Sequence, residues 1–527
     1  MSEVATRGVP TGFLSPEPDV RLSRAFEAPF ANFLATARTC YSSKGIIRDD
    51  EVGEPERFAP LAKSIFEADH HTTYQHAQFQ FALANVSRQF IWSFIHSHPF
   101  YNSEQVSQRY VAMKKEGMTI PNFNSPRAQE VFSETVDLQF AAYLRLCELL
   151  EKTVEEAFFE RFNRSERMEK KHRVTITKKA QEIARYVLPL ATHAYLYHTV
   201  SAITLLRYYR MCRVLDVPTE TKLIVEKMVG LVLRHDSDYG IILQEPLSPE
   251  EMAEYEFYDR RPDILEGSQT ASFRSYFDNQ MDSFSFSKMV AHTSNGEDIV
   301  ADAVREVLGC GNITRQDAIA MALHPEKNRI LGEAMNLTTH GNLTRALFHS
   351  HYTFKKRLSH TADSQDQRHR MTPGSRPVLA AHIDETPDYI TPDLIRENPE
   401  ALALYQDTME RTWDAICTLR VLGADHEQWT YLLPNAVTIR FTESTDLLNL
   451  RHKHVMRLCY NAQEEIWRAS VEEARQIREA QPLIGQYLLP PCTLRAMGHV
   501  KPICPEGPRY CGVRVWKQDL EKYSRKI

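Results

Sequence analysis

The chain has 527 residues and a formal net charge of −6. Its length exceeds what one ordinary hydrophobic core serves, so we expect two or more domains. The acidic balance argues against a broad nucleic-acid-binding face but allows local basic pockets. The nine cysteines form no CxxC pair, which favours a reduced compartment over a disulfide framework.

The N-terminus has no pattern of a targeting segment. MSEVATRGVPTGF lacks the apolar core of a signal peptide, and no apolar run reaches the length of a membrane span. We therefore predict a cytoplasmic protein without a membrane or nucleic-acid partner. Residues 1–18 are punctuated by Pro and Gly and are predicted to form a flexible arm.

The plan of the first half of the chain returns in the second half. Residues 19–45 predict a short strand, a turn and a helix that carries Arg38, which we expect to be structural. Residues 287–311 predict the same elements, with Arg305 in the corresponding place. Such a repeat indicates a tandem duplication.

The later part of each copy supports the duplication. Residues 180–213 and 426–466 each carry a glutamate, Glu182 or Glu427, then a Leu-Pro pair and a helix dense in Arg and His. We predict an α/β (α+β) fold of two tandem units, each a small sheet packed with long helices. The predicted divisions are a first unit at 19–244, a linker at 245–286, a second unit at 287–480 and a C-terminal tail at 481–527.

One stretch of the first copy has the composition of an anion site. Residues 87–111 read SRQFIWSFIHSHPFYNSEQVSQRYV, an aromatic run followed by a polar cluster that ends at Arg109. A hydroxyl-rich turn ending in an arginine can present N–H groups, a Ser oxygen and a guanidinium to one phosphate. The alternative is a buried helix followed by a solvated polar turn.

With these stretches laid out, the chain resembles the flavin-dependent thymidylate synthase family, present twice. In the first copy the resemblance rests on ARTCYS, HHTTYQHAQFQF, SEQVSQRYV and EIARYVLPLAT. In the second copy it rests on VREVLGCG, SHYTFKKRLSHTADSQDQRHRM, TYLLPNAVT and MRLCYNAQEEI. It covers roughly residues 19–240 and 287–480.

This resemblance implies a function and its cofactors. It implies bound FAD, a deoxyuridylate-type substrate, methylenetetrahydrofolate as carbon donor and NADPH as reductant, with hydride delivered by the reduced flavin and no cysteine nucleophile. Active sites of the family lie where the subunits of a tetramer meet. A tandem chain is therefore expected to bind a pyrimidine deoxynucleotide and to form a homodimer that is a pseudo-tetramer.

The resemblance also implies site residues. The nucleotide-phosphate segment falls on Gln105, Val106, Ser107 and Arg109, and the helix arginine that contacts nucleotide falls on Arg457 of the second copy. The flavin-contacting positions fall on Thr72, Gln75 and Arg185, together with His96 and His98 at the place of the family's Arg-His-Arg signature.

Both copies depart from the family pattern. His96-Ser97-His98 supplies less positive charge at neutral pH than two arginines, because free histidine has a pKa of about 6.5. The second copy is expected to have Lys355-Lys356-Arg357 at this place.

The losses of the two copies are complementary. Asp366 is expected to stand in the second copy where the first has Ser107, and an acid there would repel a phosphate. Conversely, the first copy has Cys212 where the second has Arg457. We therefore predict composite sites in which Arg109 of one copy works with Arg457 of the other.

Three alternatives remain open. The protein acts on another pyrimidine nucleotide, or it is a non-catalytic nucleotide-binding relative, or it is a metal enzyme that uses its clustered histidines. The histidines in question are His70, His71, His76, His96 and His98 in the first copy and His349, His351 and His360 in the second. The tail also holds Cys492, His499, Cys504 and Cys511, whose wide spacing favours ordinary thiols over zinc ligands, so we predict no metal site.

Overall fold

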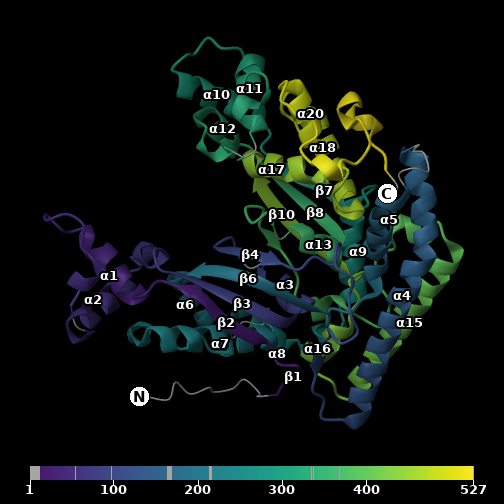
Figure 1. The fold of residues 1–527 in the computed structure, drawn as a ribbon, viewed down its shortest axis with the longest axis horizontal. Coiled ribbons are helices and arrows are strands. Elements are labelled where there is room, and N and C mark those ends of the chain that lie inside the picture. The colour runs from purple at the N-terminus through teal and green to yellow at the C-terminus, as the bar shows by residue number, and fades with distance from the viewer. Residues whose placement is uncertain are drawn as a thin grey trace.

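The computed structural model describes residues 12–527 except 54, 96–97, 163–168, 213–216, 334, 336, 367 and 526. Two four-stranded antiparallel sheets stand out, one in each unit (Figure 1). Both have the same strand order, which confirms the predicted class of two tandem α+β units. The first is β2 (Asp19–Ala25), β3 (Gln78–Ser87), β6 (His193–Ser201) and β4 (Tyr101–Gln105), and the second is β7 (Ser287–His292), β8 (His351–Ser359), β10 (Thr438–Asp446) and β9 (Gly374–Ser375).

The helices also recur in order. In each unit a short helix follows the second strand of the sheet. Another short helix follows the third strand of the sheet and leads to a long amphipathic helix. The helices of the first unit are α1 (Pro29–Thr39), α2 (Pro55–Glu67), α3 (Arg88–Ile95), α4 (Pro126–Phe162), α5 (Glu169–Ala184), α6 (Ala202–Met211) and α7 (Thr219–His235). Those from residue 287 onward are α10 (Gly296–Leu308), α11 (Arg315–Leu323), α12 (Asn342–Arg345), α13 (His360–Asp366), α14 (Asp393–Arg396), α15 (Pro399–Val421), α16 (His426–Trp429), α17 (Leu447–Arg457), α18 (Glu464–Ala480), α19 (Pro482–Gly485) and α20 (Pro491–Met497).

The register of the sheets defines which positions of the two units correspond. Ser87 lies opposite His193 in the first sheet, and Ser359 lies opposite Thr438 in the second. These pairs equate β3 with β8 and β6 with β10. Counting residues onward from these pairs also equates the helices that follow the strands, α3 with α13 and α6 with α17.

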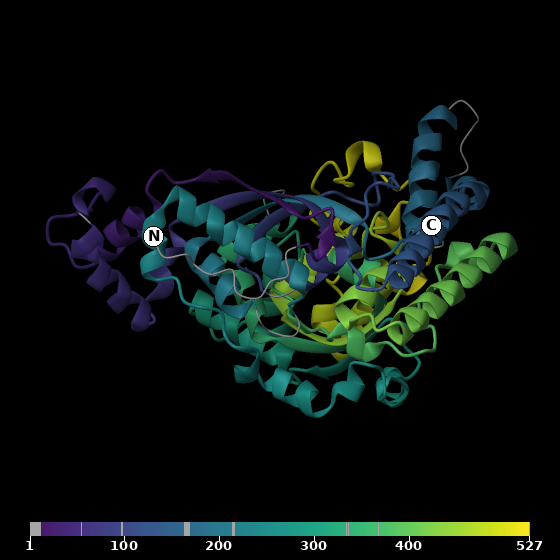
Figure 2. The same cartoon turned by 90° about the horizontal axis from the view of Figure 1, so that it is seen from below.

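The long helices join the two units. α4 and α5 of the first unit pack together, and α4 also packs along α15 of the second, so that they lie side by side in both views (Figures 1 and 2). Phe132, Tyr143 and Leu150 of α4 are buried at helical spacing, which explains why this segment is a helix with one apolar face. The hydrophobic core of the second unit therefore continues into α4 and α5 of the first, while the first sheet packs on a separate core.

The two Leu-Pro pairs meet at the centre of this boundary. The Leu190 N–H donates to the Leu433 carbonyl at 2.8 Å, and the Asn435 N–H donates to the Leu188 carbonyl at 2.8 Å. The exchange is reciprocal, as at a two-fold axis between identical subunits.

A buried glutamate in each unit repeats this symmetry. Glu220 accepts hydrogen bonds from the Ser87 N–H at 2.7 Å and from the Tyr431 hydroxyl of the other unit at 2.8 Å. Glu465 takes the same place in the second unit and accepts from the Tyr186 hydroxyl of the first at 2.7 Å. The duplicated units are thus packed through equivalent residues.

The segments outside the two units are folded onto them. The predicted linker contains α8 (Ala253–Arg260) and α9 (Thr270–Met281), whose Phe277 and Met281 are buried. Residues 1–11 of the predicted arm lie outside the described residues, whereas β1 (Leu14–Ser15) pairs with β5 (Ile120–Pro121). Of the helices that the structure describes, none is long and apolar enough to cross a membrane.

Candidate active site

The polar stretch is a strand and a turn. β4 carries Gln105 at its end, and the Val106 N–H then donates to the Tyr195 carbonyl at 3.0 Å. The Ser107 carbonyl accepts the N–H groups of Tyr110 and Val111 at 3.2 and 3.1 Å and closes the turn. A strand thus separates the buried helix α3 from the polar turn, which the sequence alone does not indicate.

Arg88, at the start of α3, holds the approach to this turn in place. Its Nη1 donates to Oε1 of Gln105 at 2.9 Å, and its Nη2 donates to the Val106 carbonyl at 3.0 Å. Burial, with some repulsion from Arg185, lowers the pKa of Arg88 to about 9. Arg88 is not among the site residues expected from the sequence, although a charged side chain at the start of an aromatic run is a usable signal.

Arg109 crosses to the second unit. Its Nε contacts the carboxylate of Glu182, and its Nη2 donates to the Asn461 carbonyl at 2.8 Å. Nζ of Lys179 lies 2.9 Å from the other oxygen of Glu182. Burial acts to raise the pKa of Glu182, but Arg109 and Lys179 outweigh it and hold that pKa well below its usual range.

Arg457 approaches the same place from the second unit. It ends α17, its Nη2 donates to the Gln365 carbonyl, and its Nε lies 3.8 Å from Oδ1 of Asp366. Burial lowers the pKa of Arg457 to about 10; Asp366 opposes this shift, and the charge of Arg109 adds to it. The structure therefore brings Arg109 and Arg457 together across the boundary between the units.

Arg185 completes this group of cations. It is almost fully buried, its Nε donates to the Glu182 carbonyl at 3.2 Å, and its Nη2 makes no hydrogen bond. Among the residues that the structure describes, four buried N–H donors around the turn lack a hydrogen-bond acceptor: Arg88 Nε, Gln108 Nε2, Arg185 Nη2 and Arg457 Nε. Buried donors without partners are uncommon and unfavourable, so this region is suited to an anionic acceptor.

A groove runs from this region along the first sheet. A cavity of about 500 Å³ lies over β4 and β6, and an adjoining one of about 270 Å³ shares four of its lining residues. Both volumes are comparable to small-molecule sites. The larger cavity is lined by Gln105 and Arg368 among others, the smaller by Gln75 and Arg207, and both by Tyr101, Asn102, Thr199 and Arg370.

Two arginines of the second unit reach over this groove. Arg368 lies 3.1 Å from the carboxylate of Glu104, and Arg370 donates to the Pro99 carbonyl at 3.2 Å and stands over the ring of Tyr101. Neither arginine is among the site residues expected from the sequence. Residues 368–370 nevertheless spell Arg-His-Arg, so the signature sought in the first copy is present as a sequence in the second.

The residues expected to contact flavin do not all line the groove. Gln75 lines the groove, and Thr72 is exposed on the same short helix, η2 (His71–Gln75). His96 lies outside the described residues. Nε2 of His98 is 2.6 Å from the Tyr208 hydroxyl, and burial lowers the pKa of His98 to about 4, so this imidazole is neutral.

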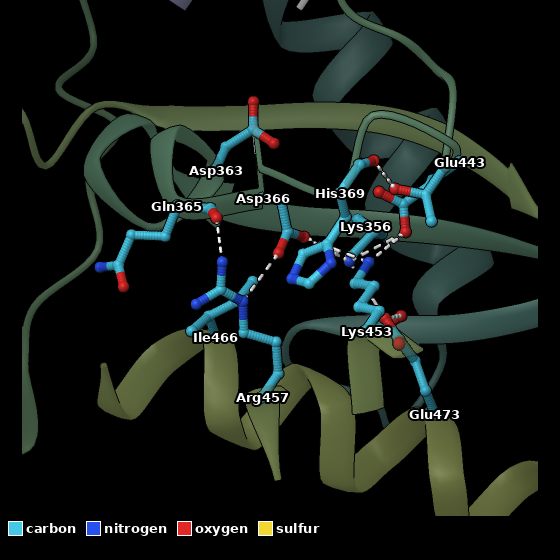
Figure 3. A network of polar contacts seen from close by, with 12 residues as sticks. Lys356, Asp363, Gln365, Asp366, His369, Glu443, Lys453, Arg457, Ile466 and Glu473 are labelled. Carbon is cyan, nitrogen blue, oxygen red and sulfur yellow. Dashed lines mark hydrogen bonds and ion pairs between the residues drawn. The ribbon is translucent and has the colours of Figure 1, made fainter. Parts of the chain in front are cut away.

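The second copy differs from expectation at Lys356 and Asp366 (Figure 3). Lys356 lies in β8, fully buried, with Nζ 3.1 Å from Asp366, 3.3 Å from Glu443 and 3.0 Å from Glu473. Lys453 contacts Asp366 at 3.2 Å and also Glu443. The expected match of 355–357 to the signature is wrong, because these residues lie in β8, the counterpart of β3. The match of Asp366 to Ser107 is also wrong, because Asp366 and Lys356 are buried in the interior of the second unit.

The first unit has an uncharged interior at the corresponding positions. Phe94 follows Ser87 by seven residues as Asp366 follows Ser359, and the sheet register equates His198 with Glu443. Phe94, His198 and Tyr208 form an aromatic cluster with ring centroids 4.6–5.9 Å apart. The second unit thus has a charged set where the first unit is uncharged. Lys356 corresponds to Leu83, Asp366 to Phe94, Glu443 to His198, Lys453 to Tyr208, and Glu473 to Met228.

Comparison with known proteins places the chain in a family. The family model described as thymidylate synthase complementing protein matches residues 21–235 and 288–483. The chain belongs to this family. Its two separate matches confirm that the thymidylate synthase complementing unit occurs twice, as the sequence predicts.

Curated relatives of this chain are named flavin-dependent thymidylate synthase. The one from Thermococcus kodakarensis is 28% identical over 210 residues, which is 37% of this chain and 78% of the relative. The one from Saccharolobus solfataricus is 25% identical over 210 residues, 39% of this chain and 78% of the relative. A solved structure, the UMP/dUMP methylase PolB from Streptomyces cacaoi bound with 5-Br dUMP, aligns with a TM-score of 0.30 and 15% identity over 42% of this chain and 92% of that one.

Proposed function

We propose that this chain is a flavin-dependent enzyme that methylates a deoxyuridylate-type nucleotide, with methylenetetrahydrofolate as carbon donor and NADPH as reductant. The observation that carries the proposal is the position of Arg109, whose charge acts on Arg185 of its own unit and on Arg457 of the second. The named function of the curated relatives supports it.

The nucleotide phosphate is proposed to bind at the polar turn. Arg185 Nη2, Gln108 Nε2 and Arg457 Nε are buried donors without acceptors, and each such donor costs about 1–3 kcal/mol. A phosphate has enough oxygen acceptors to satisfy all three. Arg109 would add a charge-assisted contact if its guanidinium is shared between Glu182 and the phosphate.

The groove is proposed to hold FAD. Its donors, Arg207, Arg368 and Arg370, suit the pyrophosphate of a dinucleotide, and Gln75 lies at one end. These residues therefore fit the cofactor that the relatives' name implies. Bound FAD, once reduced by NADPH, would supply hydride to the pyrimidine.

The arrangement favours composite sites over two identical ones. The first unit supplies the polar turn and Arg185, and the second supplies Arg457, Arg368 and Arg370. In the second unit the interior behind the equivalent site is filled by the ion network of Lys356 and Lys453. We further propose that two chains associate into a pseudo-tetramer, which light scattering of the full chain tests.

The deciding experiment is the visible spectrum of the purified chain, followed by anaerobic reduction with NADPH with and without dUMP. We expect flavin absorbance, faster bleaching of the flavin when dUMP is present, and deoxythymidylate once methylenetetrahydrofolate is added. A chain that binds dUMP but neither takes up added FAD nor oxidises NADPH would contradict the proposal and favour a non-catalytic nucleotide-binding protein. Flavin reduction without deoxythymidylate would point to another pyrimidine substrate.

A further inference from the structure

Four of the nine cysteines line one small cavity near the C-terminus. The cavity measures about 10 Å³, close to the space of one water-sized sphere. Its cysteines come from separate segments: Cys459 from the turn between α17 and α18, Cys492 from α20, and Cys504 and Cys511 from the tail. Four cysteines from separate segments thus line one cavity.

The residues at this cavity differ from the possible zinc ligands that the sequence shows in the tail. The tail offers His499 beside Cys492, Cys504 and Cys511, but the side chain of His499 is 77% exposed and lies 3.9 Å from Glu326. Cys459, which precedes Cys492 by 33 residues, takes its place at the cavity. Sequence spacing could not reveal this set, because its first member belongs to the second unit.

We propose that Cys459, Cys492, Cys504 and Cys511 bind one Zn²⁺ as thiolates in a tetrahedral structural site. Four sulfur ligands around a closed centre are typical of structural zinc. On binding, the four thiols release their protons and the four sulfur–zinc bonds form, with no change of oxidation state.

The thiols are not arranged to hold an ion as they stand. In the part of the chain that the structure describes, no three His, Cys, Asp or Glu side chains form a ready metal site. Burial raises the pKa of Cys459 to about 12 and that of Cys492 to about 11, so both are uncharged thiols without a metal. Zinc ligation therefore requires their deprotonation and a turn of the sulfurs toward the centre.

Main-chain donors are already in place for thiolates. The N–H of Asn461 hydrogen-bonds Cys459, and the N–H of Glu506 hydrogen-bonds Cys504. Donors of this kind stabilise the negative charge of metal-bound sulfur. Each donor lies two residues after the cysteine that it contacts, which indicates two turns of similar form.

The proposed zinc would hold in place a turn that belongs to the candidate active site. Cys459 lies between Arg457 and Asn461, the acceptor of Arg109. Binding Cys459 to the tail would fix this turn against α20. The effect on nucleotide affinity rests on the proposed function, whereas the presence of zinc does not.

The test is elemental analysis of the purified full chain. We expect about one zinc per chain, loss of nearly all of it in Cys504→Ser, and retention in Cys310→Ser, which removes an exposed cysteine outside the cluster. Because Cys504→Ser could fail to fold, the wild-type chain is also stripped with a chelator and refilled with Co²⁺. An intense thiolate-to-cobalt absorption band and a recovered melting temperature are expected.

Three results would overturn this site. They are a wild-type chain without zinc that takes up no Co²⁺, iron together with sulfide in place of zinc, and a disulfide among the four cysteines in mass spectra of the unreduced chain. Loss of dUMP binding with zinc retained would instead count against the proposed function alone.

Discussion

Arg109 donates a hydrogen bond to the main-chain carbonyl of Asn461 at 2.8 Å, and this contact joins the polar turn of the first unit to the turn after α17 of the second. Arg457 ends α17 only four residues earlier. One chain thus contains an interface that separate subunits would otherwise have to form. The composite sites that the sequence predicts require such an interface within one chain.

The reciprocal tyrosines should contribute equally to stability. Tyr431→Phe and Tyr186→Phe each remove a hydroxyl that donates to a buried glutamate, at 2.8 and 2.7 Å. We expect each to lower the free energy of unfolding by about 1.5–3 kcal/mol, measured by urea denaturation. Tyr41→Phe, at an exposed position, is the control. Losses below about 0.5 kcal/mol in both variants would contradict the reciprocal packing.

Glu220 should make stability depend on pH. Burial raises its pKa to about 7 although Ser87 and Tyr431 donate to it, whereas an unfolded glutamate has a pKa of about 4.3. Between these values the folded state keeps a proton that the unfolded state has lost. Its contribution is therefore complete below about pH 4 and is lost as the pH rises through 7, by at most about 1.4 kcal/mol per pH unit.

Glu220→Gln keeps the shape of the side chain and removes this titration. Urea denaturation across that interval should show a smaller fall in stability with rising pH than in the wild-type chain. The same fall in both proteins would assign the titration to another group.

The buried ion network should tolerate loss of a pair better than loss of one charge. Lys453→Met leaves Glu443 and Asp366 short of a partner and should destabilise the chain by about 3–5 kcal/mol. Adding Glu443→Gln restores the charge balance and should recover part of that loss. If Glu443→Gln lowers the free energy of unfolding as much in the Lys453→Met chain as in the wild-type chain, the two charges are not coupled.

Arg370 should matter for the cofactor and little for stability. It lines both cavities of the groove and contacts the Pro99 carbonyl. We expect Arg370→Ala to lower FAD affinity about 10-fold or more, as removal of a charge-assisted contact does. Fluorescence titration of the flavin measures this, with Arg411→Ala, which removes an exposed ion pair, as control. Equal FAD affinity in the two variants would place the cofactor elsewhere.

The sequence predicts the repeated architecture well because its signals are local. The strand and helix periods, the Leu-Pro pairs and the two glutamates lie within short windows, and the structure contains two sheets of the same order. The placement of Arg109 near Arg457 follows from treating the copies as partners. The roles of these residues stay predictions.

The groove could not be predicted in the same way. Arg368 reaches Glu104 across 264 positions of sequence, and no local pattern reports such a contact. Asp366 was expected beside a phosphate because the motifs were counted along the chain. That count matched the signature to residues 355–357, which lie in β8, whereas the sheet register equates Asp366 with Phe94, so the aspartate falls in the core.

Calorimetric titration of dUMP into the full chain and into Arg109→Ala and Arg457→Ala tests the central claim most directly. If the phosphate binds between the units, each substitution should weaken binding by about 10- to 100-fold, and Arg127→Ala, an exposed control, should leave it unchanged. The double variant should lose less than the sum of the two single losses, because both arginines contact one phosphate. Wild-type affinity in both single variants would contradict a nucleotide site between the two units.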